Sequence, residues 1–487
     1  MSLYTEKDFH RLKPIESNKG DLPQDASRTD VRRDYARILH SPAFRRLQGK
    51  TQLFPGDETD FFRNRLTHSL EVAQIAKDIA IKINHDVEFF KMGENSINPD
   101  ICEIAGLIHD LGHPPFGHNG EKALDDCMKS TGGFEGNAQT LHILLRTEKK
   151  EMGPGANYAT GYEKAVDKRL GLNLTHRVVA SALKYDQIIP YCRKKTDKLV
   201  KGYYSIDSEM IDTIKSNIRQ NVSSDKPFKT IECQIMDIAD DIAYSTYDIE
   251  DALKAEFITP FDIISCGSGI TGQIAKKINE TEGRDFITSD EVKRRLLEIF
   301  GSTLAPITEP FGEYKGGDDP SATLKLYELL EKVTSSYEAS KWFSQNGYIR
   351  TSSTSFLVHW FILGVKVDIN EEDPTQSKVY LDEETKKNVE VLKHYCFINL
   401  INSPKLKISE FRGYDIIRSI FAVLTNSDEE GHKLLPADFQ KIYEILPTNT
   451  AKNRLVCDFI AGMTDRYAIE FYGRLNSENP QSIFKPF

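Results

Sequence analysis

The chain has 487 residues, of which 39% are hydrophobic and 28% charged, and its formal net charge at pH 7 is −10. This is the balance of a folded globular protein, and an aromatic content of 10% excludes an intrinsically disordered chain. Because the negative charge disfavours non-specific binding to nucleic acids, a phosphate-bearing ligand needs a local basic site.

The cysteines and the lack of long apolar runs indicate in which cellular compartment the protein is expected. The seven cysteines are dispersed and form no C-x-x-C pair, which argues against a disulfide framework or a structural zinc site. The charged first residues contain no apolar segment typical of a secretory signal. No run approaches the roughly 20 apolar residues of a membrane span. We therefore expect a cytoplasmic protein with no membrane contact.

Helical periodicity dominates the chain and strand alternation is scarce, which predicts an all-α fold. Residues 68–83, 101–110 and 230–257 each carry isoleucines at three- and four-residue steps, typical of amphipathic helices. Further helices are expected at residues 289–300, 324–343, 355–367 and 384–401.

Glycine-rich stretches suggest the domain organisation. Residues 151–173 are glycine-rich and aperiodic, which predicts a loop insertion, and residues 266–272 and 315–321 interrupt the second half. We expect an N-terminal arm and helix over residues 1–60, a catalytic core over 61–280 and a C-terminal helical region over 281–487.

The segment His109–Glu121, HDLGHPPFGHNGE, follows a predicted helix and holds three histidines and two carboxylates. At a helix end the backbone can turn His109 and Asp110 toward one point, and two other predicted helices can supply His68 and Asp240. Two imidazoles and two carboxylates suit Mn²⁺, Fe²⁺, Co²⁺, Ni²⁺ or Zn²⁺, with Mg²⁺ also possible. Taken singly, each of these residues is as well explained by packing or surface exposure.

The ordered series His68, His109-Asp110 and Asp240 resembles the signature of the HD superfamily of metal-dependent phosphohydrolases. The surrounding blocks narrow the resemblance to the bacterial deoxynucleoside triphosphate triphosphohydrolases, the dGTPase-like proteins. These blocks are AFRRLQGKTQLFP, NRLTHSLEV, HDLGHPPFGHNGE, FEGNAQTL, GLNLTHRVVASALKY, MDIADDIAYSTYDIEDAL and DFIAGMTDRYA. The resemblance is dense over about residues 28–260 and returns near 454–470.

The resemblance implies a fold, an activity and partners. It implies an HD-domain helical core whose nucleotide pocket is completed by the C-terminal helical region. The implied reaction is metal-dependent hydrolysis of a dNTP, with dGTP favoured, to a 2′-deoxynucleoside and inorganic triphosphate by attack at the α-phosphorus. Mn²⁺ or Mg²⁺ is the expected metal. Family members commonly form homo-oligomers, often hexamers, and some respond to a nucleotide effector or single-stranded DNA.

The histidine-rich segment also predicts proton-handling residues. His118 lies beyond the Pro-Pro turn, where it can approach the phosphate from outside the metal shell, and we expect it to act as the general acid/base. Protonation of the departing 5′ oxygen is the favoured role, and which group handles which proton stays open. If a helix begins there, Glu121 is placed to orient the His118 ring. His113 is expected to face the phosphates as a donor.

Asp240, Tyr244 and Asp248 follow one another at four-residue steps, so they form a stripe distinct from the isoleucine face. The resemblance implies that Tyr244 packs on the deoxyribose, and that Asp248 with Gln48 binds the 3′-hydroxyl. Neighbouring Glu250 and Asp251 are expected to be solvated.

The triphosphate requires cations. Arg65 lies one turn before His68 and resembles the phosphate-binding arginine of the family, since a guanidinium binds phosphate in a bidentate way. Lys184, Tyr185 and Lys201 are further substrate-binding candidates by resemblance. Asn137 is a pocket candidate, although an amide beside a glycine also suits a local backbone cap. The basic residues Arg45 and Arg46 fit a surface role equally well.

Two alternatives stay open at this point. One is another HD-type nucleotide phosphohydrolase, such as a nucleotidase or a guanosine tetraphosphate hydrolase. The other is a regulator that binds nucleotides or single-stranded DNA with a vestigial site. The intact set of predicted metal ligands favours an enzyme.

Overall fold

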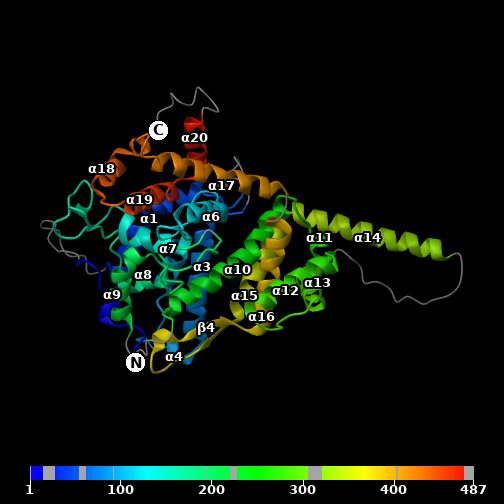
Figure 1. The fold of residues 1–487 in the computed structure, drawn as a ribbon. Helices are drawn as coiled ribbons and strands as arrows, with labels where there is room; N and C mark the ends of the chain where they lie inside the picture. The colour runs from blue at the N-terminus through cyan, green and yellow to red at the C-terminus, as the bar shows by residue number, and fades with distance from the viewer. Residues whose placement is uncertain are drawn as a thin grey trace. The chain divides into compact units, whose positions relative to one another are not determined.

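The computed structural model describes residues 2–14, 28–53, 62–91, 93–194, 196–219, 227–304, 321–401 and 404–476. This described part of the chain is built of helices, with strands only in two short pairs (Figure 1). The predicted all-α fold is therefore confirmed. Among the helices described, none is both long and apolar enough to cross a membrane.

The chain divides into two compact units. The first comprises residues 1–240, 366–380 and 407–487, and the second comprises 241–365 and 381–406. The first unit thus combines the N-terminal half with the last helices of the chain. The three-part division predicted at residues 60 and 280 stays a prediction.

Among the described residues, the first unit contains most of the helices and a short hairpin. Its elements are α1 (Asp30–Leu39), α2 (Pro42–Arg46), α3 (Arg65–Asp86), α4 (Glu88–Lys91), α5 (Pro99–Ile108), α6 (Gly117–Met128), α7 (Gly136–His142), β1 (Tyr162–Glu163), β2 (Val166–Asp167), α8 (His176–Ser181), α9 (Ser208–Ile218), most of α17 (Pro404–Thr425), α18 (Ala437–Ile445), α19 (Asn449–Ala461) and α20 (Asp465–Leu475). Helix α10 (Ile231–Lys254) begins in this unit and continues into the second. One core cluster joins apolar residues of α1, α5, α8 and α9, and another joins those of α6, α17, α19 and α20.

Helices α3 and α5 carry the metal-ligand candidates and pack closely. Asn64 caps α3, because its side-chain oxygen accepts the Thr67 N–H at 3.0 Å. The predicted isoleucine stripe of α3 is fully buried. A Cβ on Gly106 of α5 would lie 2.4 Å from the Ala73 Cα, so the two backbones approach to a distance that only glycine permits. This contact sets where α5 ends relative to α3.

Gly106→Ala is expected to lower the free energy of unfolding by about 1–3 kcal/mol, because the added methyl group must push α5 away from α3. Urea unfolding followed by circular dichroism measures the change. Gly272→Ala in the second unit is the control, since its Cβ would meet nothing within 4 Å and alanine favours a helix. Equal stability of both variants would contradict the close approach.

The second unit holds the remainder of α10 and six further helices. These are α11 (Pro260–Ile264), α12 (Ser268–Glu282), α13 (Ser289–Leu304), α14 (Ser321–Gln345), α15 (Gly347–Leu363) and α16 (Glu383–Cys396). Arg295 of α13 is buried, and it binds Glu384 at 3.0 Å and Asn388 at 2.8 Å on α16. Strands β3 (Val365–Asp368) and β4 (Lys378–Leu381) pair with each other, and all of their residues except Val365 and Leu381 belong to the first unit.

Two local predictions differ from the structure, and a third segment shows more detail than expected. The helix expected over residues 355–367 ends at Leu363, because the alternating sequence after Gly364 forms β3. The glycine-rich residues 266–272 include the start of α12 rather than only a break. The predicted insertion at 151–173 contains the β1–β2 hairpin. Residues 315–320 lie outside the described residues.

Candidate active site

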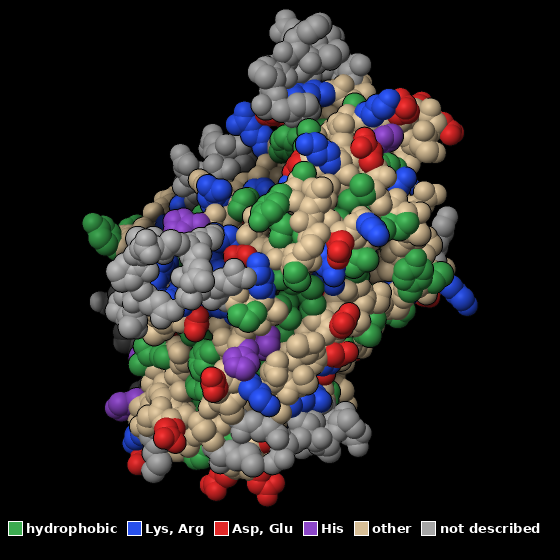
Figure 2. Space-filling model, turned by 90° about the vertical axis from the view of Figure 1, so that its left-hand side faces the viewer, with side chains coloured by type: hydrophobic (Ala, Val, Ile, Leu, Met, Phe, Trp, Pro, Cys, Tyr) green, Lys and Arg blue, Asp and Glu red, His purple; other side chains and the backbone are tan. Residues whose placement is uncertain are grey.

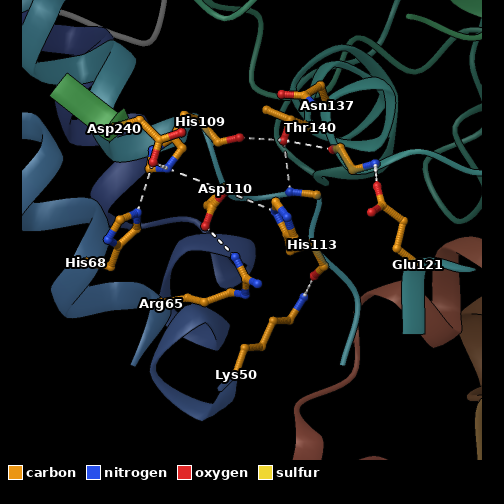
Figure 3. Close-up of polar contacts among 12 residues, drawn as sticks. Lys50, Arg65, His68, His109, Asp110, His113, Glu121, Asn137, Thr140 and Asp240 are labelled. Atoms are coloured by element: carbon orange, nitrogen blue, oxygen red, sulfur yellow. Dashed lines mark hydrogen bonds and ion pairs between the residues drawn. The ribbon is translucent and has the colours of Figure 1, made fainter. Parts of the chain in front are cut away.

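Four predicted ligands come together from three helical segments of the first unit. His68 lies on α3, His109 and Asp110 follow α5, and Asp240 lies on α10 (Figure 3). His68 Nε2 is 3.2 Å and His109 Nε2 is 3.7 Å from Asp240 Oδ1, and His109 Nε2 is 3.4 Å from Asp110 Oδ1. One ligand atom from each of His68, His109 and Asp110 lies within 4.8 Å of the others. Nitrogen and oxygen atoms at these separations fit around one divalent cation with bonds of about 2.0–2.2 Å.

The hydrogen bonding of His109 supports this interpretation. His109 Nδ1 lies 2.6 Å from the Gly106 carbonyl oxygen, which can only accept a hydrogen bond. The proton is therefore on Nδ1, and the lone pair of Nε2 faces the two carboxylates. Nε2 is buried and has no hydrogen-bond partner among the described residues. A buried acceptor oriented in this way by a backbone carbonyl is typical of a metal-ligating histidine.

Both carboxylates of the cluster are held in the ionised form that a metal requires. Burial raises the pKa of Asp110, but the neighbouring His113, His109 and Arg65 outweigh it and hold this pKa well below its usual range. Burial likewise opposes ionisation of Asp240, and His109 together with the hydrogen bond from His68 outweighs it, so the pKa of Asp240 is strongly lowered. Both carboxylates are therefore ionised at neutral pH.

Two buried cations lie beside the cluster. The Arg65 guanidinium, at the start of α3, forms an ion pair with Asp110 Oδ2. Lys50 Nζ donates to the carbonyl oxygens of His113 and, at 2.9 Å, of Ala461. Burial and the charges of Arg46 and Arg65 lower the pKa of Lys50 to about 7. Sequence reasoning missed Lys50, because nothing in the block AFRRLQGKTQLFP that contains it distinguishes a buried lysine from a surface lysine.

The loop between α5 and α6 carries the remaining histidines. His113 Nδ1 lies 2.9 Å from Asp110 Oδ1, whereas the His118 side chain is 81% exposed, with its ring centroid 5.8 Å from that of His113. Helix α6 begins at Gly117, as the prediction for Glu121 requires. Glu121 Oε2 lies 3.2 Å from His118 Nδ1, while its Oε1 accepts the Gly136 N–H at 2.8 Å. Glu121 is thus anchored to α7 and holds one nitrogen of the His118 ring.

The environment of Glu121 keeps it ionised. Burial raises its pKa, but the hydrogen bond from His118 and the charge of His113 lower it to about 2. Because a carboxylate accepts hydrogen bonds only, the His118 Nδ1 atom donates to it. His118 Nε2 is then the nitrogen that can exchange a proton with a ligand.

Of the predicted substrate-binding residues Lys184, Tyr185 and Lys201, Lys184 lies beside Asp240. Lys184 Nζ lies 2.7 Å from Asp237 Oδ1 and 3.5 Å from Asp240 Oδ2, so this lysine borders the cluster. Lys201 Nζ donates to the Tyr185 hydroxyl at 3.0 Å. Asp237 is a further residue that sequence reasoning missed, since its charge could not be distinguished from those of the other acidic residues on α10.

The remaining binding candidates in the first unit make local contacts or are exposed. Asn137 Nδ2 donates to Glu135 Oε1 at 2.6 Å, which fits the alternative of a local contact. Gln48 is exposed in a short 3₁₀ turn after α2. Arg45 and Arg46 are exposed, and Arg46 lies 3.9 Å from Glu148, which agrees with a surface role.

The stripe on α10 continues into the second unit. Tyr244 is half-buried and Asp248 is buried there. The expectation that Glu250 and Asp251 are solvated is wrong, because they are 8% and 4% exposed. Residues 245–253 are buried almost without interruption, so this part of α10 is covered on all sides and has no solvated face.

Comparison with known proteins gives two family matches and several relatives. Residues 65–245 match the HD domain, and residues 379–474 match the phosphohydrolase-associated domain. The chain is 45% identical to a deoxyguanosinetriphosphate triphosphohydrolase-like protein 2 of Mesorhizobium japonicum, over 99% of this chain and 100% of the relative. It is 30% identical to such a protein of Aliivibrio salmonicida and 28% identical to one of Vibrio parahaemolyticus, in each case over 94% of this chain and 95% of the relative.

Proposed function

This chain belongs to the HD-domain family of deoxyguanosinetriphosphate triphosphohydrolase-like proteins, and on that premise we propose the reaction that it catalyses. It is a phosphohydrolase that converts a dNTP, with dGTP favoured, into the 2′-deoxynucleoside and inorganic triphosphate. Water attacks the α-phosphorus, and the bond to the 5′ oxygen breaks. The observation that carries the proposal is the buried, unpartnered His109 Nε2, which faces two ionised carboxylates beside His68.

The residues present fit a divalent metal, held by His68, His109, Asp110 and Asp240. When bound, Mn²⁺ or Mg²⁺ supplies Lewis-acid polarisation of an α-phosphoryl oxygen and lowers the pKa of water. The Gly106 carbonyl selects the His109 tautomer whose Nε2 can bind a metal, and the Arg65 guanidinium helps to keep Asp110 ionised.

The remaining residues divide the work of phosphoryl transfer, which needs positioning and charge neutralisation. Arg65 and Lys184 border the carboxylate cluster, where their charges can neutralise the triphosphate. His113 donates to phosphate oxygens. His118 delivers a proton from Nε2 to the departing 5′ oxygen, while Glu121 orients the ring through Nδ1.

The proposed contacts with the substrate rest on the resemblance to the family and on the distribution of charge. Tyr244 packs on the deoxyribose, Asp248 and Gln48 bind the 3′-hydroxyl, and Tyr185, Lys201 and Asn137 complete the site. On the face drawn in Figure 2, Lys and Arg side chains are scattered among Asp and Glu side chains, so local cations rather than a broad basic field attract the substrate. Homo-oligomerisation, an effector nucleotide or single-stranded DNA, and a cytoplasmic location stay predictions.

The products of single dNTP incubations test this proposal. The protein with Mn²⁺ or Mg²⁺ is expected to release triphosphate and deoxynucleoside in equal amounts, fastest from dGTP, and excess EDTA is expected to stop the reaction. Ion-exchange chromatography separates triphosphate from pyrophosphate and orthophosphate. Release of pyrophosphate or orthophosphate would indicate another HD-type phosphohydrolase, and binding without turnover would indicate a regulator.

A further inference from the structure

One side chain in the first turn of α20, that of Asp465, contacts two other segments: the turn at Thr51 and the loop that joins α5 to α6. Asp465 Oδ2 accepts the Thr51 N–H at 2.9 Å, and its Oδ1 accepts the Phe116 N–H at 3.0 Å. Both oxygens of this carboxylate are therefore used to hold the main chain of other segments. Thr464, just before it, caps α20 by accepting the Tyr467 N–H at 3.2 Å.

Phe116 is a position where such support matters. Its φ is +62°, in the left-handed region that non-glycine residues rarely adopt, and Gly117 follows with a φ of +55°. A backbone held in this region persists only when the surroundings impose it. Phe116 precedes the first residue of α6, and His118 is the second residue of that helix. The direction in which His118 leaves the loop therefore depends on the Phe116 conformation.

The segment between α19 and α20 also supports the other end of the loop that joins α5 to α6, at His113. Lys50, directly before Thr51, donates both to the His113 carbonyl and to the Ala461 carbonyl at the end of α19. A Cβ on Gly49 would lie 2.6 Å from Thr464 Cγ2, so this turn packs directly on the start of α20. Residues 49–51 and 113–116 are thus joined through 461–465.

We propose that Asp465 is a positioning residue that sets the conformation of the His113–His118 loop and thereby the placement of the His118 ring. It touches neither the metal-ligand candidates nor the reacting atoms. The part of this proposal that concerns turnover rests on the proposed function. Residue 465 lies in the segment that matches the phosphohydrolase-associated domain, so the proposal gives that segment a role in positioning the loop.

Hydrogen–deuterium exchange tests the contact without any assay of turnover. In Asp465→Ala protein, peptides that contain the Thr51 and Phe116 amides are expected to exchange faster than in the wild type, because both N–H groups lose their acceptor. Asp465→Asn retains the size of the side chain and one acceptor oxygen, so a smaller effect is expected. Arg466→Ala is the control, because this neighbour is 89% exposed and pairs with Glu470 on its own helix. Unchanged exchange at both amides in Asp465→Ala would overturn the proposal.

A double-mutant cycle tests the link to His118. Asp465→Ala is expected to lower kcat about 10²-fold with little change in Mn²⁺ affinity, since misplacing a catalytic group by about 1 Å has an effect of this size. In the His118→Ala background the same substitution is expected to change kcat by less than about threefold, because its effect acts through that ring. Multiplication of the two losses would overturn the proposed role. Absence of dNTP hydrolysis by the wild type would refute the proposed function, and exchange at Thr51 and Phe116 would still decide the role of Asp465.

Discussion

Asp110→Ala is expected to abolish detectable Mn²⁺ binding and to lower dNTP turnover by at least about 10³-fold, equivalent to ~4 kcal/mol of transition-state stabilisation. The physical reason is that the two carboxylate oxygens of Asp110 make different contacts. Its Oδ1 lies beside His109 Nε2, and its Oδ2 pairs with Arg65. Without the carboxylate the metal loses a charged ligand, and the buried Arg65 guanidinium, left without its partner, repels a cation. Isothermal titration calorimetry with Mn²⁺ and a triphosphate-release assay measure the two losses.

The controls for this substitution separate metal loss from unfolding. Asp110→Asn retains the shape of the side chain, and we expect a folded protein that also binds Mn²⁺ weakly. Asp78→Ala removes an exposed carboxylate from the same helix as His68 and is expected to retain metal binding and turnover. Full Mn²⁺ affinity in Asp110→Ala, with a wild-type circular dichroism spectrum, would show that the metal lies elsewhere.

His118→Ala is expected to retain Mn²⁺ affinity and thermal stability but to lose about 10²–10⁴-fold in kcat, the usual contribution of a general acid. The ring is 81% exposed, so its removal leaves no buried cavity, and it contacts Glu121 rather than the carboxylate cluster. Because the vacated position is open to solvent, added imidazole is expected to restore part of the turnover. Steady-state kinetics with and without imidazole measure this recovery.

His85→Ala provides the matched histidine control. That ring is 86% exposed on α3 and pairs with Asp86, so its loss is expected to leave kcat unchanged. If His118→Ala lost metal affinity as completely as Asp110→Ala does, the division between ligand and proton donor would be wrong.

Some site residues could be predicted from the sequence because the chemistry of their side chains is unusual in its context. His109 and Asp110 stand at the end of an apolar helix where packing has no use for them, and the three histidines around the Pro-Pro turn have the same property. Glu121 could be related to His118 because three residues separate neighbours on one face of a helix. These inferences needed only local geometry.

Other features could not be predicted because ordinary residues acquire their significance through contacts between distant segments. Lys50 and Asp465 lie within blocks that carry the family resemblance, but nothing in those blocks shows that each residue joins segments far apart along the chain. Glu250 and Asp251 were expected at the surface on account of their charge, and they are buried because α10 is covered on every side there. The close approach of Gly364 to Thr385 on α16 is likewise a contact between segments separated in sequence.

The all-α class, the long helices with their apolar stripes, and a set of two imidazoles and two carboxylates suited to a divalent cation follow from the amino-acid sequence, because helical period and ligand chemistry are local properties. The folded chain is needed to show that Asp240 meets His68 and His109, which nitrogen of His109 carries its proton, and which cation pairs with Asp110. These depend on where separate helices meet and on which buried polar atoms must satisfy one another, and packing across the fold settles both.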